Sequence, residues 1–188
     1  MSCKVFIISG KTGSGKSTIS EMLKSQYGFP IVSFVNIGKT FARKHGKEHL
    51  RDCYKTLEPD EFKHSLVNDI KEIIDEAIKD NEVLILDGLY AYDAIVNIQK
   101  KCAVVVIYLQ VSDSVRYSRI SKRLNVDIDS AIKEENLKEE IKKSLGNDLI
   151  IDMVDYSVDG NMPVEVVKDE VYKIILKELI SGDKHLNR

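Results

Sequence analysis

Short apolar runs alternate with amphipathic stretches along this 188-residue chain. The apolar, β-branched runs are Lys4–Ser9, Ile31–Val35, Val83–Asp87, Ala103–Leu109 and, more weakly, Tyr156–Asp159. Near-continuous runs of this length are typical of strands that a parallel sheet buries on both faces. Between the runs, apolar residues recur every three or four positions within Pro59–Asp80 and again from Val164 to Leu179, which predicts two amphipathic helices.

The alternation of strands and helices predicts β-α-β crossovers, and therefore an α/β fold with an open parallel sheet. The chain shows no internal repeat and no linker-like segment, so we expect a single domain over residues 1–188. In such sheets, ligands bind beyond the carboxyl ends of the strands. Three segments fall at these ends and are the first places to look for function: Gly10–Thr18, Asp87–Tyr92 and Gln110–Asp113.

Composition narrows the classes of partner. The chain is 43% hydrophobic and 31% charged, with a formal net charge of −2, which is typical of a folded, soluble protein. This balance favours neither an extended nucleic-acid surface nor a membrane surface, and no apolar stretch has the length of a membrane span. Cys3, Cys53 and Cys102 lack metal-binding spacing, which indicates reduced thiols and a cytoplasmic location. The oligomeric state is unreadable from the sequence.

The most specific motif follows the first apolar run. Gly10–Thr18 reads G-K-T-G-S-G-K-S-T and matches G-x-x-x-x-G-K-[ST] between a strand and a helix, the pattern of a phosphate-binding loop. Glycines let the backbone N–H groups point inward at phosphate oxygens, and the following helix adds its positive end. Lys16 brings a mobile charge to the phosphates. The predicted nucleotide contacts are Gly10, Thr12, Gly13, Ser14, Gly15, Lys16, Ser17 and Thr18.

A carboxylate ends the third apolar run. Asp87 closes V-L-I-L-D, where an unpaired buried acid would be costly. Beside a phosphate loop, such an acid can hold Mg²⁺ through water or accept a proton from an attacking oxygen. The Ser17 hydroxyl can ligate the same ion. We therefore expect Mg²⁺ as a cofactor, with Ser17 and Asp87 as its protein anchors.

A basic row follows the fourth run. Arg116, Arg119 and Arg123 are spaced three and four residues apart within Ser112–Leu124, so a helix would carry them on one face. Guanidinium groups in one row repel one another unless they meet an anion, and Arg suits the planar oxygens of a phosphoryl group. A solvated cationic face paired with nearby acids is the alternative.

The order of these motifs resembles the nucleotide-kinase branch of P-loop proteins, which includes adenylate and cytidylate kinases and dephospho-coenzyme A kinase. The resemblance implies a three-layer α/β/α fold with a five-stranded parallel sheet in the order 2-3-1-4-5, and ATP as the phosphoryl donor. It implies that Arg119 covers the adenine, and that Arg123 and Arg116 reach the transferred phosphate from a lid at about residues 119–136. D-Y-S-V-D-G-N, ending at Asn161, is similar to the strand that precedes the last helix near the adenine. The candidate catalytic residues are Lys16, Asp87, Arg119 and Arg123.

The acceptor side departs from the family pattern. Ile31–Lys47 resembles the acceptor segment of monophosphate kinases, within an insertion expected at about residues 36–62. There Lys39 follows Gly38 in place of an Asp, and Arg43 comes one residue late. That slip rotates a helical side chain by about 100° and leaves its direction open. D-G-L-Y-A, starting at Asp87, replaces D-G-x-P-R and resembles the E-G-x-x-A of uridine-kinase-like nucleoside kinases. The candidate acceptor contacts are Lys39, Arg43, Arg51, Tyr90 and Arg116.

The sequence thus predicts an ATP- and Mg²⁺-dependent kinase of a small nucleotide-like acceptor, with a (deoxy)nucleoside monophosphate as the leading candidate. A dephospho-coenzyme A kinase-like or uridine-kinase-like enzyme stays open. So does a nucleic-acid end kinase or a regulatory NTP-binding protein. A switch GTPase is disfavoured, because neither N-K-x-D nor D-x-x-G occurs in the chain.

Overall fold

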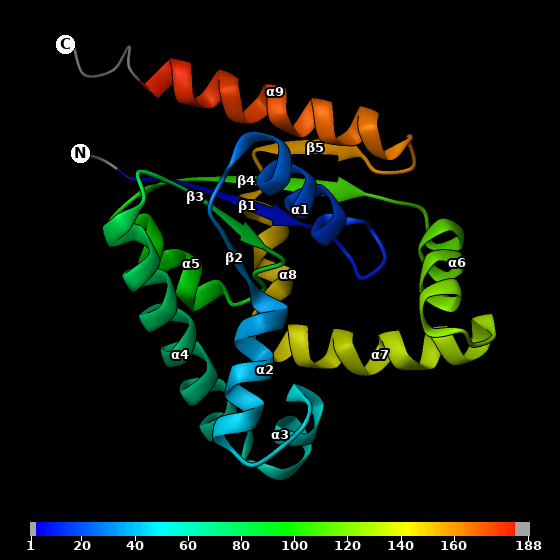
Figure 1. Ribbon diagram of the computed structural model, residues 1–188. Helices are drawn as coiled ribbons and strands as arrows, with labels where there is room; N and C mark the ends of the chain where they lie inside the picture. Colours follow the sequence, from blue (N-terminus) through cyan, green and yellow to red (C-terminus); the bar gives the residue numbers. More distant parts are fainter. Residues whose placement is uncertain (1–2, 183–188) are drawn as a thin grey trace.

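The computed structural model describes residues 3–182, and in these residues five strands form one parallel sheet (Figure 1). The strands are β1 (Lys4–Ser9), β2 (Ile31–Ser33), β3 (Val83–Asp87), β4 (Ala103–Gln110) and β5 (Tyr156–Asp159). Their order is β2-β3-β1-β4-β5, and every pair is parallel. The predicted fold class and strand order are confirmed.

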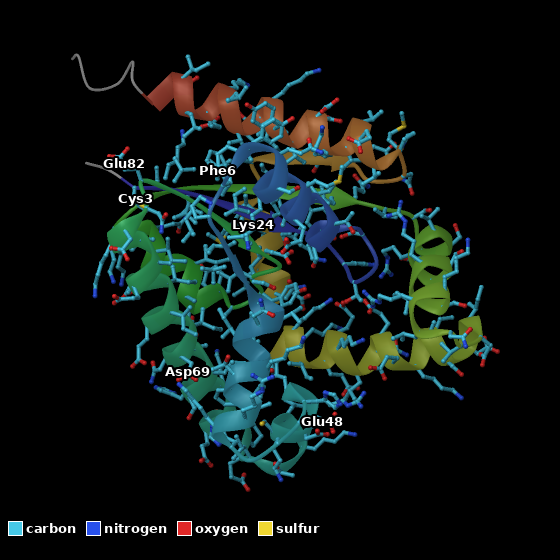
Figure 2. The ribbon with its side chains drawn as sticks, in the orientation of Figure 1. Cys3, Phe6, Lys24, Glu48, Asp69 and Glu82 are labelled. Atoms are coloured by element: carbon cyan, nitrogen blue, oxygen red, sulfur yellow. The ribbon has the colours of Figure 1, made fainter. Side chains whose placement is uncertain are left out.

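Two helical layers cover the sheet, one on each face (Figure 1). One layer holds α1 (Lys16–Tyr27) and α9 (Val164–Gly182), and Phe6 points into it from β1 (Figure 2). The other holds α4 (Pro59–Asp80), α5 (Tyr92–Gln99) and α8 (Asn147–Ile150), which runs on into the short 3₁₀ helix η1 (Ile151–Met153). The apolar stripe predicted within Pro59–Asp80 packs into this second core, because four of its members are buried: Phe62, Leu66, Ile70 and Ile74.

Four further helices lie beyond the carboxyl ends of the strands. These are α2 (Phe34–Lys44), α3 (Leu50–Thr56), α6 (Asp113–Leu124) and α7 (Ile128–Ser144). In Figure 1, α7 runs from the foot of α6 across to α2 and α8, and it contacts α6, α3 and α8. The phosphate loop and α7 therefore lie on the same side of the sheet.

Two predicted strand ends are wrong: β4 continues one residue past Leu109, to Gln110, and β2 ends early. The run Ile31–Val35 forms a strand only as far as Ser33, and Phe34 begins α2. β2 pairs with β3 alone, and Ser33 already sits opposite Asp87, the last residue of β3. Beyond that point an extended chain would have no partner for its backbone groups. Within residues 3–182, no helix is long and apolar enough to cross a membrane.

Candidate functional site

Residues 10–15 form a tight loop between β1 and α1, and three glycines give it its shape. Gly10, Gly13 and Gly15 have φ values of +141°, +82° and +97°, a region that other residues rarely adopt. A Cβ on Gly13 would lie 2.9 Å from the carbonyl oxygen of Arg116, and one on Gly10 would lie 2.7 Å from that of Leu109. The glycines thus serve both the turn and the close approach of β4 and α6.

Lys16 lies folded over this loop. Its Nζ donates to the carbonyl oxygens of Gly10 at 2.6 Å and Lys11 at 3.0 Å, and the side chain is buried. Burial, together with repulsion from the nearby Lys142, lowers the pKa of Lys16 to about 7. Phosphate oxygens can replace the two carbonyl oxygens as acceptors, and their charge would favour the ammonium form.

Asp87 and Ser17 have the chemistry of a magnesium site. Asp87 is buried, and its Oδ1 has no hydrogen-bond partner among the described residues, while Ser33 Oγ donates to Oδ2 at 3.5 Å. Burial raises the pKa of Asp87, and the Ser17 hydroxyl and the Lys16 ammonium oppose that rise. A buried carboxylate oxygen without a partner, next to an exposed hydroxyl, fits a hard cation that also takes phosphate oxygens. Within residues 3–182, no cluster of three His, Cys, Asp or Glu side chains could hold a metal on its own.

The three arginines of α6 separate in the structure. Arg119 donates from Nη1 to the carbonyl oxygens of Gly13 at 3.3 Å and Ser14 at 3.4 Å, and from Nη2 to that of Gly160 at 3.0 Å. It therefore joins the phosphate loop to the β5–α9 connection. Arg123 is exposed and lines the main cavity.

Arg116 lies buried behind the phosphate loop. It is only 2% exposed, and its Nη1 donates to the carbonyl oxygen of Thr12 at 2.8 Å and to Glu135 Oε1 at 3.3 Å. Nε and Nη2 both donate to Asp113 Oδ1. The described residues that line the cavity do not include Arg116. The spacing predicted three arginines that share one face and meet a bound anion. In the structure, Arg116 instead pairs with the carboxylates of Asp113 and Glu135.

A cavity of about 680 Å³ extends from the phosphate loop to α2, α3 and α7. Lys16, Ser17, Asp87 and Arg119 line its loop end, and Arg123 lines it from the last turn of α6. Of the predicted acceptor contacts, Lys39 and Arg51 line the part beside α2 and α3, whereas Arg43 is exposed and is not among the lining residues. Tyr90 lines the cavity close to the loop, because Lys16 Nζ lies 6.0 Å from the centre of its ring. Arg51 donates from Nη1 to Glu134 Oε1 of α7 at 3.1 Å. A smaller cavity of about 250 Å³ lies on the other side of Arg119, against Thr18 and Gly160.

Asn161, the predicted adenine-side residue, organises the β5–α9 connection. Its Oδ1 accepts from the backbone N–H of Ser112 at 3.1 Å, and its Nδ2 donates to Asp159 Oδ1 at 2.7 Å. It lines neither cavity, but its neighbours Gly160 and Met162 line the smaller one. Asn161 therefore fixes the backbone beside that cavity.

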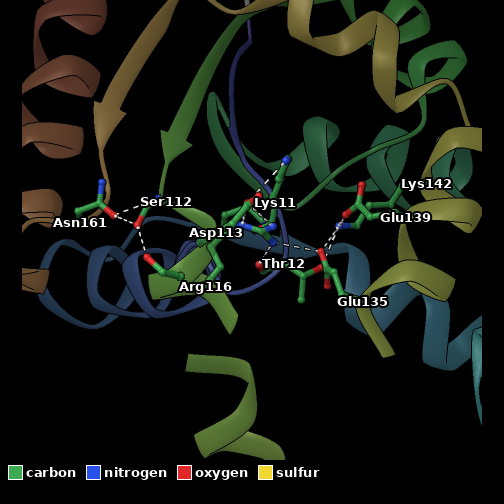
Figure 3. Close-up of polar contacts among 11 residues, drawn as sticks. Lys11, Thr12, Ser112, Asp113, Arg116, Glu135, Glu139, Lys142 and Asn161 are labelled. Carbon is green, nitrogen blue, oxygen red and sulfur yellow. Dashed lines mark hydrogen bonds and ion pairs between the residues drawn. The ribbon is translucent and has the colours of Figure 1, made fainter. Parts of the chain in front are cut away.

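The buried polar residues of α7 were not predicted from the sequence. Glu135 and Lys142 are buried, and Lys142 Nζ donates to Thr12 Oγ1 at 2.8 Å and to Glu139 (Figure 3). A signal was present: with Ala131 and Leu145, these two residues continue a stripe of helical spacing. Charged residues at stripe positions mark a buried polar contact, because burying an unpaired charge is costly.

Comparisons with known proteins agree with this geometry. Residues 7–143 match the model of a family described as "AAA domain". A cytidylate kinase from Pyrobaculum calidifontis is 31% identical over 143 residues, which are 74% of this chain and 71% of that protein. A UPF0200 protein from Sulfurisphaera tokodaii is 24% identical, over 94% of this chain and 98% of the relative.

A solved structure supports the same fold. Shikimate kinase from Bacteroides thetaiotaomicron superposes with a TM-score of 0.62 at 14% identity, over 92% of this chain and 98% of that chain. With the phosphate loop, the strand order and these relatives together, the chain belongs to the AAA-domain family of the matching model and, within the P-loop proteins, is a kinase of the nucleotide-kinase family.

Proposed function

We propose that the protein transfers the γ-phosphoryl group of Mg²⁺-bound ATP to a nucleotide-like small molecule, with a (deoxy)nucleoside monophosphate as the acceptor. The observation that carries this proposal is the main cavity. Residues of the phosphate loop line one end of this cavity. Two cationic side chains, Lys39 and Arg51, line the other end beside apolar walls from Phe34 and Leu50. A phosphoryl donor and an anionic acceptor can therefore meet inside one cavity. The relatives named cytidylate kinase support a nucleotide as the acceptor.

The reaction needs little covalent chemistry from the protein. An acceptor oxygen attacks the γ-phosphorus in line, the bond from that phosphorus to the β–γ bridging oxygen breaks, and the acceptor gives up its proton to Asp87 or to solvent. Lys16, Arg119 and Arg123 hold and neutralise the phosphate oxygens as charge shifts. Bound Mg²⁺, anchored by Ser17 and Asp87, would supply further neutralisation of the phosphate oxygens.

Two segments would close over the reactants. Residues of about 36–62, which include α2 and α3, would cover the acceptor, and residues of about 119–136 would act as a lid, both within one domain. The Arg51–Glu134 ion pair already joins α3 to α7 across the cavity. Closure would exclude water, which otherwise competes with the acceptor for the phosphoryl group. Adenine would occupy the smaller cavity beside Arg119.

A substrate panel tests the proposal. The protein is incubated with Mg·ATP and, in turn, nucleosides, (deoxy)nucleoside monophosphates and dephospho-coenzyme A, and ADP release is measured. We expect at least one monophosphate to raise ADP release well above the acceptor-free rate. Nucleosides are included because the segment from Asp87 to Ala91 lacks the acceptor arginine of monophosphate kinases. A response to nucleosides alone would overturn the monophosphate assignment.

Two variants test the site itself. Lys16→Met and Asp87→Asn should each lower turnover by on the order of 10²-fold or more. The matched control is Lys24→Met, an exposed lysine on the same helix as Lys16 (Figure 2). Unchanged turnover in either site variant would show that the loop and Asp87 do not carry the reaction.

A further inference from the structure

A second buried lysine reaches the phosphate loop from α7. Lys142 is 5% exposed, and its Nζ donates to Thr12 Oγ1 at 2.8 Å and to a carboxylate oxygen of Glu139. It lines the main cavity together with Lys16. Lys142 therefore brings an ammonium group to the middle of the loop from the side opposite α1.

The two lysines share one wall of the cavity. Both ammonium groups lie within 6.0 Å of the centre of the Tyr90 ring, with Lys142 at 4.9 Å. Repulsion from Lys142 is the second largest cause, after burial, of the lowered pKa of Lys16. Two buried ammonium groups so close together favour an anion between or beside them. A transferring phosphoryl group is such an anion.

Acidic side chains on α7 hold this arrangement in place. Glu135 Oε1 lies 3.9 Å from Lys142 Nζ and also accepts from Arg116, while its buried Oε2 has no partner among the described residues. Glu139 pairs with Lys142 directly. Burial raises the pKa of Glu135, and the charge of Lys142 opposes that rise. The carboxylates thus hold the Lys142 side chain close to the loop.

We propose that Lys142 is a further catalytic residue: during transfer, its ammonium group breaks its hydrogen bonds to Thr12 and Glu139 and donates to the phosphoryl oxygens instead. This inference rests on the proposed function. The flexible four-carbon stem of Lys142 lets the ammonium group move without a shift of the helix. Lys142 forms no covalent bond in this role, so it contributes only charge and hydrogen-bond donors. Arg123 meets the same group from α6, and the phosphoryl group is then neutralised from both helices.

The test uses three variants of the full chain: Lys142→Met removes the charge, Lys142→Arg keeps it, and Lys143→Met alters an exposed lysine next to it on α7. We expect Lys142→Met to lower kcat by on the order of 10²-fold, the usual cost of removing one transition-state donor. Its Kd for Mg·ADP should stay within about threefold of the unaltered protein. Lys142→Arg should recover most of the lost turnover, and Lys143→Met should have no effect.

A structural role would give a different result. If Lys142 only pins α7 to the loop, Lys142→Met would weaken Mg·ADP binding by the same factor as kcat/KM, and that outcome overturns the proposal. So would a kcat equal to that of Lys143→Met. Thermal melting identifies a variant that fails to fold, and Lys142→Gln, which keeps a donor without the charge, then replaces Lys142→Met with the same expected loss.

A readout without acceptor separates this inference from the proposed function. Mg·ADP with aluminium fluoride mimics the transferring phosphoryl group, and its binding needs no acceptor. Lys142→Met should weaken the gain in affinity that aluminium fluoride adds, again by on the order of 10²-fold. If no member of the panel accepts phosphate but this loss is seen, the acceptor assignment fails and the role of Lys142 stands. An unchanged gain overturns that role.

Discussion

Replacing Arg116 with methionine tests whether this arginine supports the phosphate loop or contacts the acceptor. Arg116 is 2% exposed and makes charge-assisted hydrogen bonds to the carbonyl oxygen of Thr12 and to the buried Glu135. Its pair with the exposed Asp113 adds little, because solvent screens it. Arg116→Met therefore removes a buried hydrogen-bonding partner of Glu135, which keeps Lys142 as a nearby cation at 3.9 Å.

The magnitude follows from these contacts. Removing one partner of a buried ion pair costs about 3–5 kcal/mol. We expect about 3 kcal/mol here, since Lys142 stays 3.9 Å from Glu135 and supplies part of the lost neutralisation. That value corresponds to roughly a hundredfold change in the folding equilibrium. The double variant Arg116→Met/Glu135→Met should recover most of the loss, because apolar side chains of similar volume replace the buried pair.

Urea unfolding followed by far-UV circular dichroism measures the effect, because the chain has no tryptophan. Lys122→Met, an exposed residue of the same helix, is the control and should stay within about 0.5 kcal/mol. A loss below about 1 kcal/mol, or a double variant less stable than Arg116→Met, would refute the reasoning. Unchanged stability with a strongly raised KM for the acceptor would restore the acceptor contact that the sequence predicts.

Three further outcomes follow from the structure. Gly13→Ala should lower the free energy of unfolding in urea by about 1–3 kcal/mol, because Gly13 has a φ of +82° and the new Cβ would lie 2.9 Å from a carbonyl oxygen. The control Gly28→Ala, at a φ of +74° with open space around it, should lower it by only about 1 kcal/mol. Equal losses in the two variants would show that the close contact with the carbonyl oxygen adds nothing. Phosphate binding favours the charged form of Lys16, whose pKa is about 7. The contribution of Lys16 to the affinity for Mg·ADP should therefore be constant below pH 7 and fall as the pH rises above 7. Lys16→Met should abolish this pH dependence, and a pH dependence that persists in the variant would belong to another group. Glu134→Gln should release Arg51 and lower the KM of an anionic acceptor several-fold. Its effect on the free energy of unfolding should be near 0.5 kcal/mol, since the Arg51–Glu134 pair is partly exposed. A KM no different from that of the exposed control Glu140→Gln would count against Arg51 as an acceptor contact.

The central fold was predictable because its signals are local. Three strands begin and end where the apolar runs do, and α4 fills Pro59–Asp80 as its spacing predicts. The prediction that the second strand extends to Val35 was wrong, because the last two residues of that run lie beyond the end of the neighbouring strand. Where a strand loses its partner depends on the register of the sheet rather than on composition. Asp87 was singled out because an unpaired acid at the end of a buried run is costly, and its role as a magnesium anchor stays a prediction.

The site was less predictable where it depends on how helices pack. Spacing alone puts three arginines on one face of α6, but the angle at which α6 meets the loop decides which of them faces the cavity. Arg116 faces the back of the loop, where it donates a hydrogen bond to Glu135 of α7. Because α7 joins the loop only through tertiary contacts, no local signal places Lys142 beside Thr12.

Thr12 is a residue of the phosphate loop that both α6 and α7 contact. Arg116 of α6 binds its carbonyl oxygen, and Lys142 of α7 binds its hydroxyl group. Glu135 contacts both cations, so the loop, α6 and α7 form one connected polar unit. An anion that draws Lys142 away from Thr12 must therefore change the contacts of α7 as well as those of the loop. In the proposed reaction, binding of the triphosphate would therefore change the contacts between α7 and Thr12, a position that the loop motif leaves variable.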